Sequence, residues 1–239
     1  MTLDLLAVVA HPDDAELLCG GLLAKTARQQ KRVGILDLSA GELGSAGTRE
    51  QRAEEAAEAG RILCLSERRC AGLPDGALTD SQEARQTVIK HLRDLRPRVV
   101  VTHWPDARHP DHAAASAIAR SACFLAGLKQ FPAQGEAFRP HKLLYALTYQ
   151  ETDTKPTFVV DISAHMETKL EAIFAFGSQF SGKTKMGDVR GGGDRPLREQ
   201  ILAHHAHYGS LIRKPYAEPY WSKEVVEVDD VTSLAVPSF

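Results

Sequence analysis

Two groups of ionisable side chains directly follow two apolar runs in this sequence. The first group, AHPDDAE at residues 10–16, comes after LLAVV, and the second, HWPDARHPDH at residues 103–112, comes after RVVVT. Charged groups beside a buried strand lose hydration energy unless solvent, a helix N-terminus or a metal ion compensates for the loss. Histidine and aspartate are also common zinc ligands. The pattern therefore indicates a metal site, provided that the fold brings the two groups together.

The spacing within each group suits a divalent cation. His11 and Asp14 are three residues apart, where a strand turns into a helix, so both side chains can face one point. His109 or His112 from the second group would complete a set of two histidines and one carboxylate, which leaves coordination positions open as in catalytic zinc sites. The same donors also suit iron(II), so the sequence does not distinguish Zn2+ from Fe2+.

Apolar runs alternate with helical patterns along the chain, which favours an α/β fold. We expect strands at residues 5–10, 32–39, 98–104, 142–149 and 157–163, and helices at 15–30, 48–63, 81–95, 111–128 and 165–176. Because the strand runs lack polar–apolar alternation, we predict a Rossmann-like, mostly parallel sheet with helices on both faces. Ligands bind at the carboxyl ends of such strands, where both ionisable groups lie.

We expect one domain over residues 1–239, with a C-terminal segment from about residue 196 packed on the main body or at the rim of the site. The formal net charge of −2 gives no electrostatic footprint for nucleic acid or an anionic membrane. No apolar run approaches the ~20 residues that cross a bilayer, and no secretory signal is evident. The four cysteines form no C-x-x-C pair, so we expect free thiols in a cytoplasmic protein.

Several stretches resemble the PIG-L/LmbE family of zinc-dependent N-acetylglucosamine deacetylases. They are AHPDDAE, GELGSAGTREQRAEEA at 41–56 and HPDH at 109–112, and the likeness extends from residue 3 to about 235. TREQRAEEA, ARHPDHAAAS and SLIRKPYAEPY look most like the branch that deacetylates N-acetylglucosaminyl-malate in bacillithiol biosynthesis. The resemblance implies a Rossmann-like fold, a small-molecule N-acetylglucosaminyl substrate and a homo-oligomer, often a hexamer.

Carried over onto this sequence, the resemblance makes His11, Asp14 and His112 the zinc ligands. It makes Asp13 the general base that accepts a proton from the attacking water. Asp13 is adjacent to a ligand in sequence, but its side chain projects in another direction and can therefore stay off the metal.

The second motif supplies further roles by the same resemblance. A cationic His109 would stabilise or protonate the tetrahedral intermediate, and Asp111 would orient a histidine, although it could instead cap the helix that begins there. Arg52 and Arg108 match positions that contact substrate or the acetate product, and arginine binds carboxylates in bidentate fashion. One relative has a mobile tyrosine at the position of Ala107, so that role must fall to another residue or be absent.

Other residues invite weaker hypotheses. Glu16 and Glu42 could accept hydrogen bonds from sugar hydroxyls. GDVRGGGDR at 187–195 is typical of a mobile surface loop, or of a lid over the site. Three histidines near the C-terminus have no carboxylate partner nearby in sequence, so we expect a surface or pocket-rim position rather than a second metal, with His207 or Tyr208 in reach of substrate; the three are His204, His205 and His207.

Three other functions compete with this interpretation. A nucleotide-binding module is disfavoured because no G-x-G-x-x-G follows the first strand, and Asp13 and Asp14 would repel phosphate. The same chemistry could act on another conjugate, such as an inositol glycoside, a chitobiose or an antibiotic precursor. A metal-binding protein without catalysis is the third alternative.

Overall fold

The structure, a computed structural model, describes residues 2–44, 46–149, 154–190 and 193–236. Within these residues seven strands form one sheet in the order β3-β2-β1-β4-β5-β7-β6. The strands are β1 (Leu5–Val9), β2 (Val33–Asp37), β3 (Glu67–Cys70), β4 (Val99–Thr102), β5 (Lys142–Ala146), β6 (Phe158–Asp161) and β7 (Ala217–Trp221). The helices are α1 (Asp14–Arg28), α2 (Arg49–Ile62), α3 (Gln82–Leu95), α4 (Pro110–Leu125), α5 (Met166–Phe174), α6 (Met186–Arg190) and α7 (Leu197–Leu211).

Most of the sheet is parallel. β3, β2, β1, β4 and β5 pair in parallel in that order, whereas β7 pairs antiparallel with both β5 and β6. The mostly parallel α/β fold predicted from the sequence is therefore confirmed. The C-terminal segment, which we expected to pack on the main body or at the rim of the site, contributes β7 to the sheet.

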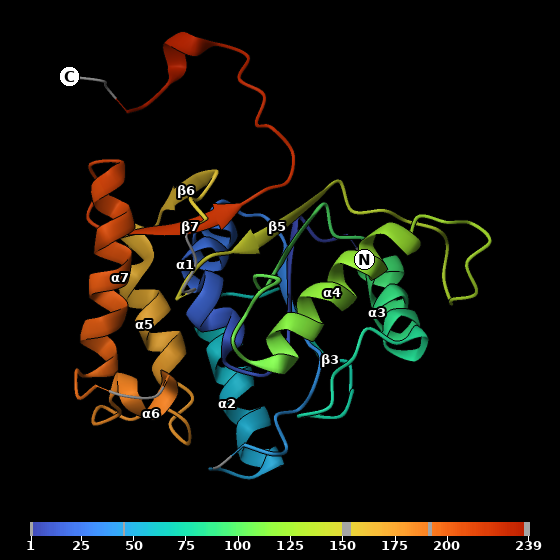
Figure 1. Cartoon of the computed structure of the whole chain (residues 1–239), viewed down its shortest axis with the longest axis horizontal. Helices are drawn as coiled ribbons and strands as arrows, with labels where there is room; N and C mark the ends of the chain where they lie inside the picture. Colours follow the sequence, from blue (N-terminus) through green and yellow to red (C-terminus); the bar gives the residue numbers. More distant parts are fainter. Residues whose placement is uncertain (1, 45, 150–153, 191–192, 237–239) are drawn as a thin grey trace.

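Helices cover both faces of the sheet, with α3 and α4 on one side and α1, α5 and α7 on the other (Figure 1). The first strand shows the consequence for the sequence. Leu5, Ala7 and Val9 belong to one buried cluster, whereas Leu6 and Val8 belong to the other. Because both faces of β1 are buried, apolar residues occupy consecutive positions, which explains the missing alternation.

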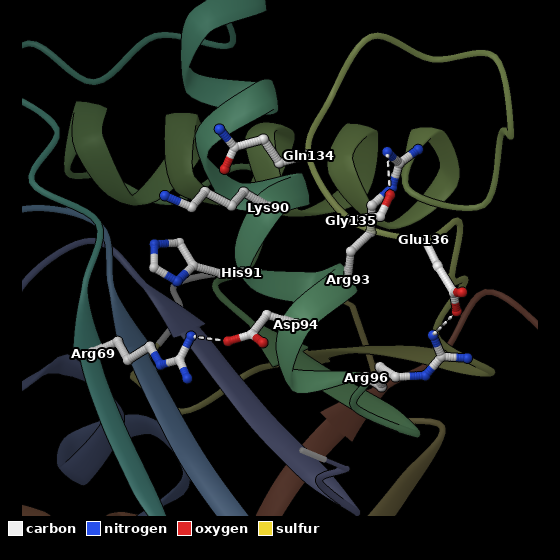
Figure 2. A pocket seen from close by; sticks show the side chains of 9 residues that line it. All are labelled: Arg69, Lys90, His91, Arg93, Asp94, Arg96, Gln134, Gly135 and Glu136. Atoms are coloured by element: carbon white, nitrogen blue, oxygen red, sulfur yellow. Dashed lines mark hydrogen bonds and ion pairs between the residues drawn. The ribbon is translucent and has the colours of Figure 1, made fainter.

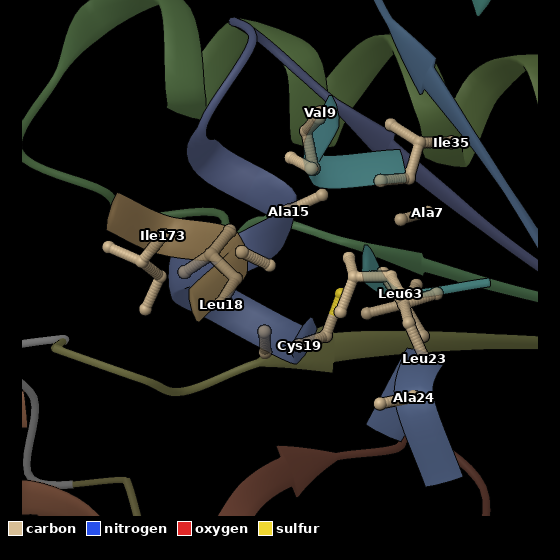
Figure 3. Close-up of a cluster of buried hydrophobic side chains, with 14 of the residues drawn as sticks. Ala7, Val9, Ala15, Leu18, Cys19, Leu23, Ala24, Ile35, Leu63 and Ile173 are labelled. Carbon is tan, nitrogen blue, oxygen red and sulfur yellow. The ribbon is translucent and has the colours of Figure 1, made fainter. Parts of the chain in front are cut away.

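Figure 3 shows part of the first of these clusters. Leu18 and Leu23 of α1 pack there with Ala7 and Val9 of β1, and Ile173 of α5 belongs to the same cluster. This cluster therefore fixes α1 against the sheet, and α1 begins at Asp14, one of the predicted metal ligands.

Two strands, β3 and β7, are not among the five expected from the sequence. β3 reads ERRC, lies at the edge of the sheet and pairs only with β2 among the described strands. Its Arg68 donates from Nε to Asp37 Oδ2 over 2.8 Å and from Nη1 to Glu16 Oε1 over 2.6 Å. Ion pairs therefore hold β3 in place, where the other strands rely on apolar side chains. For this reason hydrophobic periodicity in the sequence does not detect β3.

The local signals for helices agree better with the structure. Thr48 caps α2, accepting a hydrogen bond from Gln51 N over 3.1 Å, as the capping pattern predicts. The predicted loop at 187–195 is wrong in its first part, because α6 extends to Arg190. Gly191 and Gly192 lie outside the described residues.

Two predicted absences concern helices and cysteines. None of the helices in the described ranges has the length and hydropathy to span a bilayer. Cys19, Cys64, Cys70 and Cys123 are all free thiols, as the spacing predicts.

We expect Leu23→Ala to lower the free energy of unfolding by about 2–5 kcal/mol, because Leu23 is fully buried and its truncation leaves a cavity. Leu211→Ala is the matched control, since Leu211 is also helical but 53% exposed, and its change should stay within about 0.5 kcal/mol. Urea denaturation of the two variants measures the difference. Equal losses would show that the α1 core contributes less than its burial indicates.

Candidate metal and active site

The loops after β1 and β4 meet at the carboxyl ends of these strands, because the two strands are parallel neighbours. His11, Asp14 and His112 each offer one ligand atom, and the three atoms lie within 4.8 Å of one another. His11 Nδ1 is 3.2 Å from Asp14 Oδ2, and His112 Nε2 is 3.1 Å from Asp14 Oδ1. The structure thus brings together the donors that the resemblance assigns to zinc.

The electrostatics around His11 suit a cation. Its other ring nitrogen, Nε2, lies 3.1 Å from Asp75 Oδ1 and 3.2 Å from Asp111 Oδ2. Burial alone would lower the pKa of His11, but the carboxylates around it outweigh burial and raise this pKa to about 9. Two imidazoles and a carboxylate in a region that stabilises positive charge fit a zinc or iron(II) ion.

His103, which has no role assigned from the sequence, contacts two of the three ligand residues, Asp14 and His112. Its Nε2 accepts a hydrogen bond from Ala10 N over 3.0 Å and lies 3.4 Å from Asp14 Oδ2. Its ring stacks on that of His112 with centroids 4.2 Å apart. Burial and the neighbouring His112 lower the pKa of His103 to about 4, so the ring is neutral at pH 7. The only sequence signal for this role is its position just after β4.

Asp14 and Asp13 differ in their surroundings although they are adjacent. Burial acts to raise the pKa of Asp14, but His112 and His103 outweigh it and hold this pKa well below its usual range. Burial and the charge of Asp14 raise the pKa of Asp13 well above its usual range, with Arg52 acting against them. A carboxyl group with a raised pKa is suited to accept a proton.

Arg52 holds Asp13 away from the ligand group. Its Nη2 donates to Asp13 Oδ2 over 3.1 Å and to Pro12 O over 2.7 Å, while Nη1 donates to Gly41 O over 2.9 Å. Asp13 also has a φ of 102°, a left-handed conformation that is strained for a residue with a side chain. Arg52 is only 5% exposed, and in this geometry it supports Asp13, while its contact with substrate stays a prediction.

The second motif differs from expectation in two details. His109, not Asp111, caps α4, and its Nδ1 accepts from Asp111 N over 3.2 Å, which leaves the ring proton on Nε2. Burial, His112 and His11 lower the pKa of His109 from its usual value, which disfavours the cationic ring. Asp111 accepts from Gly76 N over 2.7 Å and approaches His11, which is the histidine that it orients.

A cavity of about 140 Å³ opens beside the ligand group. Ten residues line it, and they are Asp14, Leu17, Leu18, Ala107, Arg108, His109, His112, Thr148, Tyr149 and Val189. Arg108 is exposed at this cavity and donates from Nη2 to Val189 O of α6 over 3.5 Å. Arg108 thus lines the cavity, which α6 also borders, and its contact with substrate stays a prediction.

The two glutamates proposed to hold sugar hydroxyls lie elsewhere. Glu16 is fully buried and its carboxylate is bound by Arg68, so it cannot contact a substrate. Glu42 is exposed but does not line the cavity, and its Oε1 accepts from Asp75 N over 3.0 Å. Glu42 therefore stabilises the turn that presents Asp75 to His11.

The C-terminal histidines belong to neither candidate metal group in the described residues. His204 Nε2 accepts from Tyr149 N over 3.2 Å, so it supports a residue that lines the cavity. His205 is buried, and its Nδ1 donates to Ile201 O over 2.7 Å. His207 is exposed.

A larger cavity of about 560 Å³ lies along α3 and shares no lining residue with the metal group (Figure 2). It is rich in cations, and two of its arginines have several partners each. Arg93 donates to four backbone carbonyls, and Arg69 pairs with Glu67 and Asp94. The smaller cavity, lined by two histidines and the carboxylate of Asp14, is the better candidate for chemistry.

Comparison with known proteins identifies the family of this chain. The sequence profile of PIG-L, described as GlcNAc-PI de-N-acetylase, matches residues 6–123. The diacetylchitobiose deacetylase of Thermococcus kodakarensis is 30% identical over 187 residues, which cover 73% of this chain and 69% of that protein. This chain belongs to the PIG-L family. Both of its candidate ligand loops lie within the part that the profile matches.

Other relatives of this PIG-L chain extend the comparison. A 1D-myo-inositol 2-acetamido-2-deoxy-alpha-D-glucopyranoside deacetylase of Rhodococcus jostii is 27% identical over 236 residues, covering 73% of this chain and 81% of that protein. The crystal structure of a conserved protein from Thermus thermophilus, TT1542, has a TM-score of 0.85 and 42% identity, covering 95% of this chain and 97% of that one. The PIG-L chain is a hydrolase acting on N-acetyl groups.

We expect the wild-type chain to retain about one divalent cation after exhaustive dialysis, and His112→Ala to retain far less, because the remaining donors no longer enclose the ion. Elemental analysis of dialysed protein measures the metal content. Asp106→Asn is the control, since this exposed aspartate belongs to neither candidate group. Undiminished metal in His112→Ala would place the cation elsewhere.

Proposed function

We propose that this chain removes the N-acetyl group from an N-acetylglucosaminyl conjugate, using a zinc ion bound by His11, Asp14 and His112. The observation that carries the proposal is the group of three donor atoms within 4.8 Å, next to a carboxylate that Arg52 holds apart from them. Relatives named for deacetylation of chitobiose and of an inositol glucosaminide support the substrate class. Iron(II) is the alternative metal that the same donors accept.

The bound cation would polarise the acetyl carbonyl and lower the pKa of water at the site. Asp13 then accepts the proton of the attacking water, for which its raised pKa and its fixed position beside Arg52 prepare it. His109 lines the cavity with its proton on Nε2, from where it donates to the developing oxyanion as a neutral ring. Collapse of the tetrahedral intermediate breaks the C–N bond, and the proton held by Asp13 passes to the departing sugar nitrogen as acetate is released.

We further propose N-acetylglucosaminyl-malate, as in bacillithiol biosynthesis, as the conjugate. The support is the sequence likeness of TREQRAEEA and SLIRKPYAEPY, together with Arg108 at the mouth of the cavity. A malate group carries two carboxylates, and a guanidinium can bind a carboxylate through two hydrogen bonds. Inositol and chitobiose conjugates, the substrates that relatives are named for, are the alternatives.

We propose a homo-oligomer, a hexamer by the resemblance. Beyond β7 the chain extends away from the sheet (Figure 1), and this segment exposes apolar side chains such as Val225 at 96%, Val231 at 72% and Leu234 at 64%. Exposed apolar side chains in such a concentration favour an interface. Light scattering of the purified chain checks this, and a monomer at micromolar concentration would contradict it.

We expect the zinc-loaded chain to release free amine from N-acetylglucosaminides, and Asp13→Asn to lower kcat by about 10²–10⁴-fold while keeping its metal, because an amide cannot accept the proton. Fluorescamine quantifies the amine and elemental analysis the metal. Full activity of Asp13→Asn would exclude this residue as the base. Absence of hydrolysis by the wild type on every conjugate tested would favour a metal-binding protein without catalysis.

The same assay on malate, inositol and chitobiose conjugates tests the aglycone. We expect the highest kcat/KM on the malate conjugate, and Arg108→Met to raise KM for it by about 10- to 100-fold, corresponding to a charge-assisted contact of about 1.5–3 kcal/mol. KM for the inositol conjugate should change little. Arg120→Met, an exposed arginine that does not line the cavity, is the control. A preference for an uncharged conjugate would contradict the malate assignment.

A further inference from the structure

Helix α1 is broken one turn after the candidate metal ligand Asp14. Cys19, shown between Leu18 and Leu23 in Figure 3, has φ −143° and ψ 18°, which are not helical values. A continuous α-helix would join Leu17 O to Gly21 N and Leu18 O to Leu22 N. The break exposes these four backbone groups inside the protein, where each needs a partner.

A single carboxylate from β7 binds the two free N–H groups. Gly21 N donates to Glu218 Oε1 and Leu22 N donates to Glu218 Oε2, each over 2.8 Å. Tyr220 OH donates to the same Oε2 over 2.7 Å. Glu218 is fully buried, so it acts as an internal cap for the second part of α1.

Two other side chains bind the free carbonyls. Lys169 of α5 donates from Nζ to Leu17 O over 2.8 Å and to Glu218 Oε1 over 2.7 Å. Thr148 Oγ1 donates to Leu18 O over 2.9 Å. Three segments that are distant in sequence therefore supply side-chain partners for all four groups that the break exposes.

This arrangement costs free energy of folding, and a helix that only fills the core does not need it. An unbroken α1 would pair the same backbone groups within the helix. Burying an ammonium and a carboxylate lowers stability unless ion pairing and hydrogen bonds compensate for the lost hydration. The backbone also packs closely here, since a Cβ added at Gly21 would lie 2.7 Å from Ile162 Cδ1. The break is thus held in one geometry from several sides.

The part of α1 before the break belongs to the active site. It consists of Asp14 to Leu18, and Asp14, Leu17 and Leu18 line the cavity together with Thr148. Lys169 and Thr148 hold the carbonyls of Leu17 and Leu18 themselves, so the position of this short turn depends on them.

We propose that Lys169 and Glu218 are positioning residues for the metal site. By holding the break at Cys19, they set the direction of the turn that presents Asp14 to His11 and His112. Neither residue belongs to a candidate ligand group in the described residues, and both bind the backbone of α1. This inference rests on the proposed metal site. It adds to the residues that support this site two that lie about 150 and 200 positions from α1 in the sequence.

The test is the paired substitution Lys169→Met with Glu218→Gln, which removes both charges together and so avoids leaving one charge buried alone. We expect a folded protein by circular dichroism in which the dissociation constant for Zn2+, measured by competition with a chromophoric chelator, rises about 10- to 100-fold. In the zinc-saturated protein kcat should fall while KM for the glucosaminide changes little.

Two further variants make the result decisive. Thr148→Val keeps the shape of the side chain and removes only the donor to Leu18 O, so it should also weaken Zn2+ binding, even if the double variant fails to fold. Arg93→Met is the control, because Arg93 is a buried cation that binds backbone carbonyls at the larger cavity, which shares no lining residue with the candidate site. It should lower Tm and leave Zn2+ affinity unchanged.

Zn2+ affinity within about twofold of wild type in both Thr148→Val and a folded double variant would overturn the inference. Loss of affinity in proportion to Tm, with Arg93→Met included, would also overturn it, because it would indicate stability alone. The proposed function fails separately. A wild-type chain that binds zinc without hydrolysing any glucosaminide, while the variants lose zinc, would reject the deacetylase and support the positioning role.

Discussion

The candidate site depends on the parallel pairing of β1 with β4. The register places Ala7 beside Val101, so the two strands end at the same edge of the sheet and deliver their following loops to one place. The pairing continues beyond the strands, because Ala10 N donates to the ring of His103 over 3.0 Å. His11 and Asp111 therefore meet although they are 100 residues apart in the chain.

Negative charge is concentrated where these loops meet. His11 lies within about 3.2 Å of carboxylate oxygens from Asp14, Asp75 and Asp111. Like charges this close repel strongly in a buried region, so the arrangement requires compensating positive charge. Arg52 supplies part of it at Asp13, and a divalent cation would supply the rest. A site built in this way binds a cation and keeps one carboxylate apart from it.

Helix α1 carries Asp14 of this group and is anchored from two sides by buried ion pairs. Towards β3, Arg68 binds Glu16 of its first turn. Towards β7, Glu218 and Lys169 bind the backbone around its break. Buried ion pairs contribute little to stability compared with apolar packing, but they fix geometry through directed hydrogen bonds. The end of α1 that faces the cavity is thus the part of the helix with the most polar support.

The sequence by itself determined the alternating elements, the cap at Thr48 and the grouping of chemical side chains at two strand ends, because burial periodicity and capping are local properties. Only the tertiary structure decided that Glu16 is enclosed by Arg68, that Arg52 supports Asp13, and that β3 exists despite its charged sequence. The break in α1 was likewise decided by the tertiary structure. Its partners lie more than a hundred residues away, and contacts at such separations are set by how the sheet and helices pack.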